Sequence, residues 1–409
     1  MTEKKTNKLK ILNDPIYGFI TIPNPLIYDL IEHPYFQRLR RISQMGLSYL
    51  VYPGAHHTRF HHAIGSMHLM QKAVRILQFK GVEISEDEAN AVYIAILLHD
   101  IGHGPFSHAL ESSIVTGVHH EAISLKFMEA LNEEFDGKLS LAIEIFKGNY
   151  HRKFLFQLIS SQLDMDRLDY LKRDSFYTGV AEGNINSERL ITMLNVKDDN
   201  LVVEEKGIYS VEKFIVARRL MYWQVYLHKT GLVAEKLLEK ILKRAKEITL
   251  QGKEMPASKA FSFFLKNQID DHNFTKETLK TFARMDDYDV LSSIKEWISC
   301  DDKIISKLSE SLINRKLPKV EIHNKKYAGS YLSTIKKEVK NNFILNNKEL
   351  DYFVYYGKIF NQAYDSTKNN IRILYKNGDI KDVTEASDHL NIKALSKPVY
   401  KYYICYPKK

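Results

Sequence analysis

Residues 11–22 contain two short extended runs, and hydrophobic positions then take a helical spacing that continues through most of the chain. Two short extended runs within 11–22 flank a turn signal at Asp14-Pro15, which predicts a small β-hairpin. Residues 25–31 have helical spacing, and the pair His33-Pro34 ends that segment. A longer amphipathic pattern from Arg59 to about Gln78 predicts another helix.

The most apolar stretch, Ala91–Leu98, is hydrophobic on all sides and predicts a buried helix. Ser85 and Glu88 precede it with the spacing of a capping box. The stretch ends in the pair His99-Asp100, and two glycines and a proline follow within five residues. A buried imidazole next to a buried carboxylate is costly unless both have partners, and a divalent metal ion would be a partner for both.

Further helices are expected at 120–131, at 164–171, which is acidic on one face, and at 211–248. The last of these is one long helical pattern that only Gly231 interrupts. Beyond residue 318 the composition shifts, and β-type runs occur at 320–322, 353–356, 371–375 and 402–405. The sequence therefore predicts a helical domain over residues 1–318 and a small α+β region over residues 319–409.

Composition narrows the class of protein without defining its function. The 409 residues, 44% of them hydrophobic, suffice for a large core. No apolar run reaches the roughly 18 residues of a membrane span, the N-terminus has no signal-peptide pattern, and two cysteines are too few for a disulfide framework. We therefore expect a cytoplasmic protein with no membrane partner. The formal charge of +9 favours polyanions, but lysine-rich solubility explains it too, so nucleic acid is not an expected partner.

Histidines and aspartates offer a ligand set for a divalent ion: His62, His99, Asp100 and Asp166. Nitrogen and oxygen ligands without thiolate suit Mn, Fe, Ni or Zn, and Mg is a further candidate. A six-coordinate ion with four protein ligands keeps two positions for water and a substrate oxygen, so it could polarise a phosphoryl group. Spacing alone leaves Asp164 and Asp169 as alternatives to Asp166.

Other side chains suit phosphate chemistry. Histidines near their pKa at neutral pH could donate a proton to a leaving oxygen, and the candidates are His103, His108 and His120. Forked guanidinium groups hold phosphate oxygens well, and the candidates are Arg59, Arg167 and Arg218. Arg218 could equally form a solvated pair with Arg219. The neighbouring histidines are interpreted as surface or packing residues: His56, His57, His61 and His68.

Several blocks of the chain resemble the HD-domain deoxynucleoside triphosphate triphosphohydrolases. These blocks follow the family's order between about residues 10 and 230: 13–18, 36–40, 52–55, 59–65, 99–108, 164–170 and 226–229. The long match over His99–His108 makes the resemblance specific. It implies a mainly α fold with an HD-domain helical core, and a metal held by His62, His99, Asp100 and Asp166.

The resemblance also implies roles for the surrounding side chains. His103, His108 and His120 would surround the scissile phosphate, and Glu111 stands where the family usually has an aspartate that assists the histidines. Contacts to the triphosphate would come from Arg59, Arg167, Tyr170 and Arg218. The positions that match those reading the deoxyribose are Gln44, Met45, Asp174 and Tyr226.

The reaction implied by this resemblance is metal-dependent hydrolysis of a dNTP to a deoxynucleoside and inorganic triphosphate. A phosphohydrolase of the same fold acting on another nucleotide is one alternative, because fold alone does not fix the substrate. A nucleotide- or nucleic-acid-binding protein with a vestigial metal site is another. The complete sets of ligands and histidines argue against a vestigial site.

In a mammalian member of the family, a guanine nucleotide binds away from the metal and promotes assembly of the active tetramer. The matching positions here are Lys10, Glu32, Gln37 and Arg40. We therefore expect GTP or dGTP as an activator and a homo-oligomer, either a dimer or a tetramer. Glu32 replaces the family's aspartate and can still accept hydrogen bonds from the guanine edge. A basic helix that packs against a neighbouring subunit explains this segment equally well.

Overall fold

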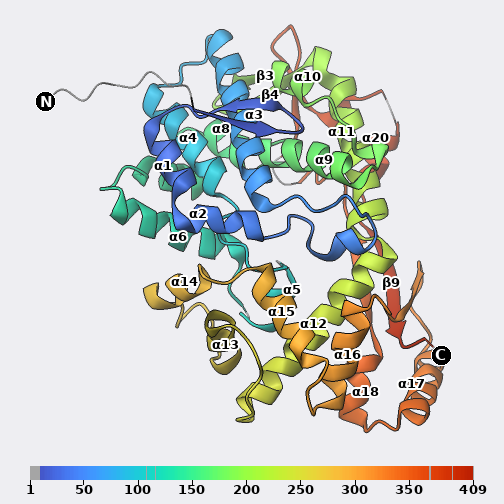
Figure 1. Ribbon diagram of the computed structural model, residues 1–409. Coiled ribbons are helices and arrows are strands. Elements are labelled where there is room, and N and C mark those ends of the chain that lie inside the picture. Colours follow the sequence, from blue (N-terminus) through green and yellow to red (C-terminus); the bar gives the residue numbers. More distant parts are fainter. Residues whose placement is uncertain (1–9, 107, 116, 368–369, 389, 409) are drawn as a thin grey trace, which may run out of the picture.

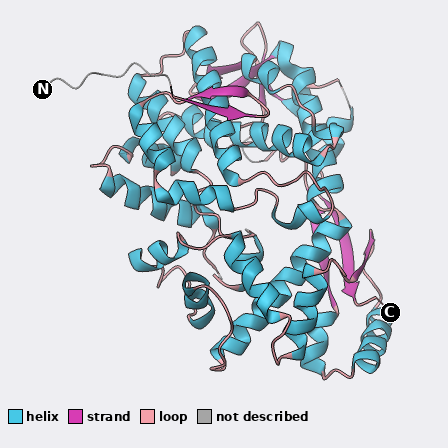
Figure 2. Ribbon diagram, in the orientation of Figure 1, coloured by secondary structure: helices cyan, strands magenta, loops and turns pink. Residues whose placement is uncertain are grey.

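Helices dominate the computed structural model, which describes residues 10–106, 108–115, 117–367, 370–388 and 390–408. The described strands are short and form three small sheets (Figures 1 and 2). The mainly α fold class with small β elements is therefore confirmed. Among the described residues, no helix has both the length and the apolar character that crossing a membrane requires.

The first part of the chain begins with the predicted hairpin, formed by β1 (Ile11–Asp14) and β2 (Gly18–Thr21). The short helices that follow are α1 (Pro25–Glu32), α2 (Pro34–Gln37), η1 (Arg38–Arg41) and η2 (Gly46–Leu50). The helices of the HD-type core and its surroundings are α3 (Arg59–Phe79), α4 (Glu86–Leu98), α5 (His108–Ser113), α6 (His120–Glu134), α7 (Ser140–Phe146), α8 (Lys153–Ile159), α9 (Met165–Thr178), η3 (Ala181–Gly183) and α10 (Ser187–Thr192).

The second half contains η4 (Glu205–Gly207), α11 (Ile208–Met221), η5 (Tyr222–Tyr226), α12 (Lys229–Leu250), α13 (Lys259–Lys266), α14 (Lys276–Phe282), α15 (Asp287–Trp297), α16 (Lys303–Ile313), α17 (Gly329–Phe343), α18 (Asn347–Phe353), α19 (Val383–Ala386) and α20 (Leu390–Leu395). Its strands and those just before it are β3 (Leu194–Lys197), β4 (Asn200–Glu204), β5 (Lys319–His323), β6 (Tyr355–Asn361), β7 (Arg372–Leu374), β8 (Ile380–Asp382) and β9 (Val399–Tyr406).

Helix α4 is the buried centre that its sequence predicts. Every residue from Ala91 to Leu98 is at most 9% exposed. The capping box is present, because Ser85 Oγ accepts from the Glu88 amide at 3.1 Å and Glu88 Oε2 accepts from the Ser85 amide at 2.9 Å. Helix α4 packs against α3, and α3 also packs against α9. These three helices therefore bring the histidines and aspartates of distant segments to one place.

The prediction of one long helix over residues 211–248 is wrong. Helix α11 ends at Met221, a π-helical turn follows at Tyr222–Tyr226, and α12 starts after His228, whose ring caps the new helix. Gly231 lies inside α12 and does not interrupt it. Apolar periodicity continues across the break, because a π turn shifts the helical register by only one residue per turn.

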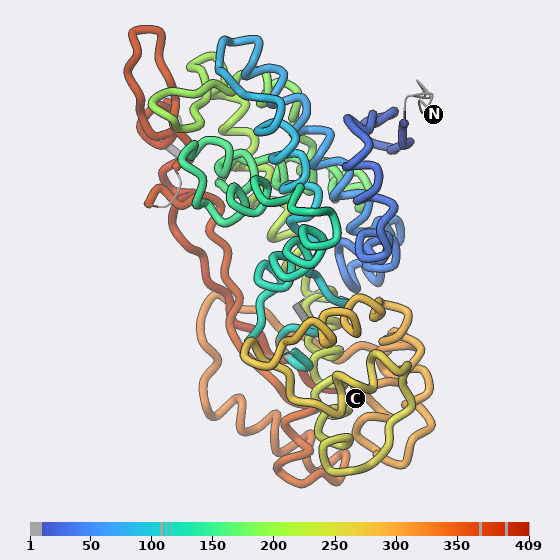
Figure 3. Tube along the Cα trace, turned by 90° about the vertical axis from the view of Figure 1, so that its left-hand side faces the viewer, coloured from blue at the N-terminus to red at the C-terminus, as the bar shows by residue number. Residues whose placement is uncertain are grey.

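The C-terminal strands divide between two sheets. β5, β9 and β6 form one antiparallel sheet, whereas β7 runs parallel to β4 and extends the β3–β4 hairpin. Figure 3 shows the last part of the chain following one side of the molecule between these two sheets. The run at 353–356 is only partly strand, because Phe353 ends α18 and β6 begins at Tyr355. The domain division at residue 318 stays a prediction.

Gly65 on α3 allows the close packing of α3 against α9. A Cβ atom there would lie 2.1 Å from Asp169 Oδ1 and 2.2 Å from Arg173 Nη2. Gly65→Ala should therefore lower the free energy of unfolding by about 1–3 kcal/mol, the usual cost of overpacking. Urea denaturation measures this change. Gly231→Ala is the matched control, because nothing lies within 4 Å of its added Cβ and the helix interior favours alanine over glycine. Equal stability of the two variants would contradict this account.

Candidate active site

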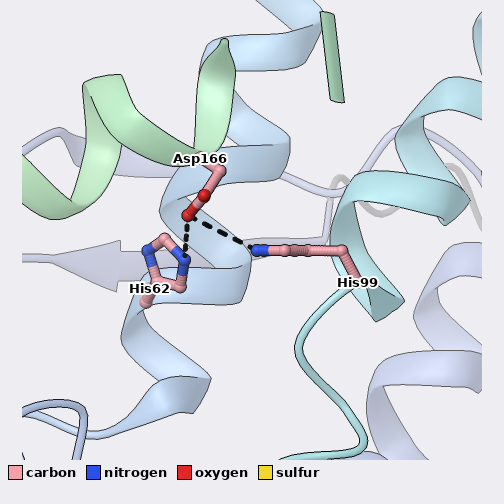
Figure 4. A group of neighbouring side chains, drawn as sticks. All are labelled: His62, His99 and Asp166. Atoms are coloured by element: carbon pink, nitrogen blue, oxygen red, sulfur yellow. Dashed lines mark ion pairs between the residues drawn. The ribbon is translucent and has the colours of Figure 1, made fainter. Parts of the chain in front are cut away.

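Three side chains from three helices converge at the centre of the fold (Figure 4). They are His62 on α3, His99 at the C-terminal end of α4, and Asp166 in the first turn of α9. Asp166 Oδ1 lies 3.1 Å from His62 Nε2 and 3.5 Å from His99 Nε2. One ligand atom from each of the three lies within 4.8 Å of the others.

Asp100 adds a second carboxylate to this group. Its oxygens lie 3.3 Å from His99 Nε2 and 3.8 Å from His62 Nε2. Arg59 Nη1 donates to Asp100 Oδ2 at 2.5 Å and fixes the carboxylate's orientation. The four residues predicted as metal ligands are therefore neighbours in space.

Hydrogen bonds on the far side of each imidazole determine its tautomer. His62 Nδ1 lies 2.8 Å from Asp169 Oδ2, and His99 Nδ1 lies 2.6 Å from the carbonyl oxygen of Ile96. A carbonyl and an ionised carboxylate only accept, so each Nδ1 carries the proton. The lone pair of each Nε2 therefore faces Asp166, and neither buried Nε2 has a hydrogen-bond partner among the described residues.

This donor set fits a divalent cation. Bond lengths of about 2.0–2.2 Å to nitrogen and oxygen place neighbouring ligand atoms roughly 3.0–3.5 Å apart. The observed separations of 3.1, 3.3, 3.5 and 3.8 Å are close to this range. Nitrogen and oxygen ligands with a histidine–carboxylate contact behind them are typical of first-row divalent ions.

The electrostatics of the group also favour a positive charge. Burial alone would lower the pKa of His62, but the carboxylates of Asp166 and Asp169 raise it to about 10. Burial alone would raise the pKa of Asp166, but His62 and His99 hold it well below its usual range. A bound metal ion would take the place of the proton that this field attracts.

Sequence spacing left three aspartates as alternatives, and the structure gives each a different position. Asp164 caps α9, where its carboxylate accepts from the amides of Arg167 at 2.7 Å and Ser161 at 2.8 Å. Asp169 lies behind His62. Only Asp166 of the three faces both Nε2 atoms.

Asp169 is itself held by Arg173, whose Nε and Nη2 each lie 2.9 Å from a carboxylate oxygen. Arg173 Nη1 extends this network to Asp14 Oδ2 at 2.7 Å. Burial alone would raise the pKa of Asp169, but Arg173 and His62 lower it to about 2. Neither Asp14 nor Arg173 was a candidate from the sequence, and their charges at distant positions gave no signal of this pairing.

A second group of titratable side chains lies next to Asp100. The rings of His103 and His120 stack at 3.9 Å with 26° between their planes, and His120 Nδ1 lies 3.0 Å from Glu111 Oε1. Imidazole lone pairs lie in the ring plane, so two stacked rings cannot both aim at one ion. This group therefore suits proton transfer better than chelation. Burial and the Arg59 guanidinium hold the pKa of His103 well below its usual range. The side chain of His108 lies outside the described residues.

Gly102 brings α6 close to the loop that carries His103. A Cβ atom at Gly102 would lie 2.2 Å from the Ser124 amide nitrogen and 2.3 Å from the His120 carbonyl oxygen. Ser124 Oγ joins the two segments, since it accepts from the Gly102 amide at 2.9 Å and donates to the His99 carbonyl at 2.7 Å. Gly102 thus allows the backbones of the two segments to approach each other closely.

Of the four predicted deoxyribose contacts, Asp174 and Tyr226 are joined by a hydrogen bond, and we call this pair the polar wall. Tyr226 donates its hydroxyl proton to Asp174 Oδ2 at 2.7 Å, and His57 Nε2 lies 2.7 Å from Asp174 Oδ1. The interpretation of His57 as a packing residue was incomplete, because it is buried and fixes Asp174. Gln44 Oε1 is buried with no hydrogen-bond partner among the described residues, and Met45 is buried.

All three predicted phosphate-binding arginines already have protein partners, and that of Arg59 is Asp100. Arg167 Nη1 donates to Asp164 Oδ2, and Arg218 Nη1 donates to the Ala363 carbonyl at 3.2 Å. In both residues the buried Nε has no hydrogen-bond partner among the described residues. Tyr170 lies near both the histidine–aspartate group and Tyr226. Its ring is 6.5 Å from that of His62 and 6.1 Å from that of Tyr226.

Two buried charges outside the predicted site hold the loop at residues 101–106. Arg38 is fully buried and donates to the carbonyls of Ile101 at 2.8 Å and His103 at 2.9 Å. Asp287 of α15 accepts from the amides of Phe106 at 3.0 Å and Ser43 at 2.8 Å. Segments far apart in the sequence therefore position the histidine loop.

The residues expected to bind a guanine nucleotide lie near the surface. Arg40 Nε donates to Gln37 Oε1 at 2.8 Å, and its guanidinium lies 3.6 Å from the centre of the Phe60 ring. Gln37 Nε2 donates to the Ile31 carbonyl at 2.7 Å. Lys10 lies over the Tyr28 ring, and Glu32 is exposed at the end of α1.

Comparison with known proteins agrees with this geometry. Residues 59–174 match the HD domain, and residues 185–263 match the HD associated region. The chain belongs to the HD-domain family of phosphohydrolases, whose domains bind divalent metals.

Relatives cover this chain to different extents. A phosphohydrolase from Bacteroides thetaiotaomicron is 52% identical, with a TM-score of 0.94 over 98% of this chain and 100% of that chain. The uncharacterized protein YwfO of Bacillus subtilis is 32% identical over 99% of this chain and 93% of its own length. A deoxynucleoside triphosphate triphosphohydrolase, the SAMHD1 homolog of Dictyostelium discoideum, is 35% identical over 54% of this chain and 46% of its own length.

Asp166 and Asp164 form a matched pair for testing the metal site. Asp166→Asn should lose most of the bound metal, because it removes the negative charge that faces both imidazoles. Asp164→Asn should retain the metal, because Asp164 caps the start of α9 and does not face the two imidazoles. Metal analysis of the purified proteins measures both, with circular dichroism to establish folding. Loss of metal from Asp164→Asn alone would reverse the assignment.

Proposed function

We propose that the protein hydrolyses deoxynucleoside triphosphates to deoxynucleosides and inorganic triphosphate. The observation that carries this proposal is that one side chain, Tyr170, lies near both the histidine–aspartate group and the polar wall, with its ring 6.5 Å from that of His62 and 6.1 Å from that of Tyr226. The histidine–aspartate group suits a metal ion beside a phosphate, and the polar wall suits a sugar. The similarity to a deoxynucleoside triphosphate triphosphohydrolase from Dictyostelium discoideum supports the same choice of substrate.

A divalent ion held by His62, His99, Asp100 and Asp166 would polarise a phosphoryl oxygen and increase the acidity of water. The protein's own cations bind the rest of the triphosphate in this proposal. Arg59 lies next to Asp100, and the buried Nε atoms of Arg167 and Arg218 are donors that a phosphate oxygen could satisfy. These contacts orient the α-phosphorus toward the metal ligands.

In this proposal a histidine beside the scissile bond donates a proton to the leaving group. A water oxygen bonds to the α-phosphorus and releases one proton to solvent as the bond to the 5′ oxygen breaks. His120, held through Nδ1 by Glu111, can then give the proton on its Nε2 to that oxygen. The longer glutamate, in place of the family's aspartate, still reaches the imidazole at 3.0 Å. His108 is the alternative donor.

The wall of Asp174 and Tyr226 would select the sugar. Asp174 can accept from the 3′-hydroxyl while it holds Tyr226, because each carboxylate oxygen has two lone pairs. The hydroxyl of Tyr226 anchors its ring to Asp174, and His57 anchors Asp174 in turn. A ring held in this way can exclude a 2′-hydroxyl by crowding.

We place the enzyme in the cytoplasm, because Cys300 and Cys405 are free and suit a reducing compartment.

The test is product analysis with each dNTP and NTP in the presence of Mn or Mg. Inorganic triphosphate and deoxynucleoside should form from dNTPs, and NTPs should react at least about a hundredfold more slowly if crowding adds to ordinary pocket selectivity. Tyr226→Ala should narrow that gap because it removes the ring. Release of pyrophosphate or single phosphates would instead indicate another phosphohydrolase. An unchanged sugar preference in Tyr226→Ala would refute the role of the wall.

Regulation by a guanine nucleotide is part of the same proposal. GTP or dGTP bound at Lys10, Glu32, Gln37 and Arg40 should raise the turnover of a second dNTP and shift the protein to a larger oligomer. By linkage, the activator and the assembled state favour each other equally. Glu32→Ala combined with Arg40→Ala should abolish the activation and retain the metal. Light scattering and turnover with and without GTP decide this, and indifference of both to GTP would exclude such a site.

A further inference from the structure

One face of the β5–β9–β6 sheet carries exposed aromatic rings. Tyr356 and Phe360 of β6 are 53% and 59% exposed, and Tyr400 of β9 is 44% exposed. Successive side chains of a strand point to opposite faces, so Tyr356, Lys358 and Phe360 share one face. Phe360 pairs with Tyr400 across the strands, and their ring centres are 5.7 Å apart. In Figures 1 and 2 this sheet lies at the edge of the molecule, beside α17. We call these three rings and Lys358 the aromatic face.

Lysines lie among these rings. Lys358 Nζ lies 5.6 Å from the Tyr400 ring centre, and Lys336 Nζ, which also pairs with Asp351, lies 5.6 Å from that of Tyr356. The sequence from 323 to 340, which precedes and forms α17, has five lysines and only Glu338 as an acid. The carboxylate of Glu321 on the same sheet is already engaged by Lys319 at 3.1 Å and by two tyrosine hydroxyls. Positive charge therefore prevails around the aromatic face.

A cavity continues the aromatic face toward α17. It has a volume of about 430 Å³, and its lining includes Lys326, Tyr327, Tyr356, Lys358 and Tyr402. Its lining contains aromatic rings and two ammonium groups but no carboxylate. The Tyr327 hydroxyl is buried and has no hydrogen-bond partner among the described residues. A ligand that combines flat rings with anionic groups would fit this lining.

The arrangement favours an extended polyanion over other occupants. Phe360 follows Tyr356 by four positions on β6, about 13 Å along a strand at about 3.3 Å per residue, which exceeds the reach of one nucleobase. Protein interfaces are depleted of lysine at their centres, whereas lysines lie between the rings here. Exposed rings interleaved with cations are the combination that binds single strands, because bases stack on the rings and phosphates meet the ammonium groups.

We propose that the aromatic face binds single-stranded nucleic acid. Bases stack on Tyr356, Phe360 and Tyr400, and phosphates contact Lys358 and the lysines of residues 323–340. The binding has little base specificity, because every base presents a π face to the rings. This interaction does not depend on the proposed hydrolysis, since none of these residues belongs to the candidate active site.

The test is fluorescence anisotropy of the full-length protein with a labelled 20-nucleotide single strand. We expect binding that weakens with salt. Phe360→Ala and Tyr400→Ala should each weaken it about tenfold, in keeping with the loss of one stacked base. Lys358→Gln should weaken binding and reduce the slope of log affinity against log salt by about one. Tyr288→Ala is the matched control, because Tyr288 is 66% exposed on α15 and lies outside the aromatic face.

The remaining measurements separate this proposal from its competitors. Metal content should be unchanged in all these variants, which also shows that they fold. Absence of binding at low salt, or equal binding by Phe360→Ala and Tyr288→Ala, would overturn the proposal. So would a change of oligomeric mass in Phe360→Ala without loss of affinity, because it would make this face a protein interface. Tighter binding of duplex than of single strands would overturn the stacking arrangement.

Discussion

The hydrogen bond between His62 Nδ1 and Asp169 is the contact on which the candidate active site depends. It fixes the tautomer of His62, so the lone pair of Nε2 faces Asp166. Asp169 can make this bond because Arg173 neutralises it inside the core and is neutralised in turn by Asp14. A buried charge without such partners would be costly, so the network is complete or the site does not form. Gly65 leaves the space that this network occupies.

The same principle extends to the loop after His99. That loop is irregular and buried, and its carbonyls and amides need partners that no regular element supplies. Arg38, Ser124 and Asp287 satisfy them from three other parts of the chain. The histidines proposed for proton transfer are therefore held by contacts outside the HD domain at residues 59–174 as well as within it. The HD-domain region and the flanking segments are therefore joined by buried hydrogen bonds at this loop.

The two sites proposed to bind nucleotides and nucleic acid carry different kinds of positive charge. In the candidate active site, Arg167 lies beside the carboxylate of Asp164, which orients it, and its buried Nε remains as a donor. On the aromatic face, the ammonium group of Lys358 lies over the exposed ring of Tyr400. Arginine suits the fixed geometry of a catalytic triphosphate site, and lysine suits a polyanion bound without a single register.

The sequence by itself determined the helical class, the capped and buried helix α4, and the residues that could bind metal, because periodicity, capping and donor chemistry are local properties. It left Asp164, Asp166 and Asp169 as alternatives, and only the packing of α9 against α3 decided which carboxylate faces Nε2 of His62. It also missed the π turn at Tyr222–Tyr226, whose apolar spacing matches that of a continuous helix. The pairings of Arg173 with Asp14, His57 with Asp174, and Asp287 with Phe106 join residues far apart in the chain. Tertiary structure alone decided them, because a buried charge finds its partner through the fold and not through its neighbours in sequence.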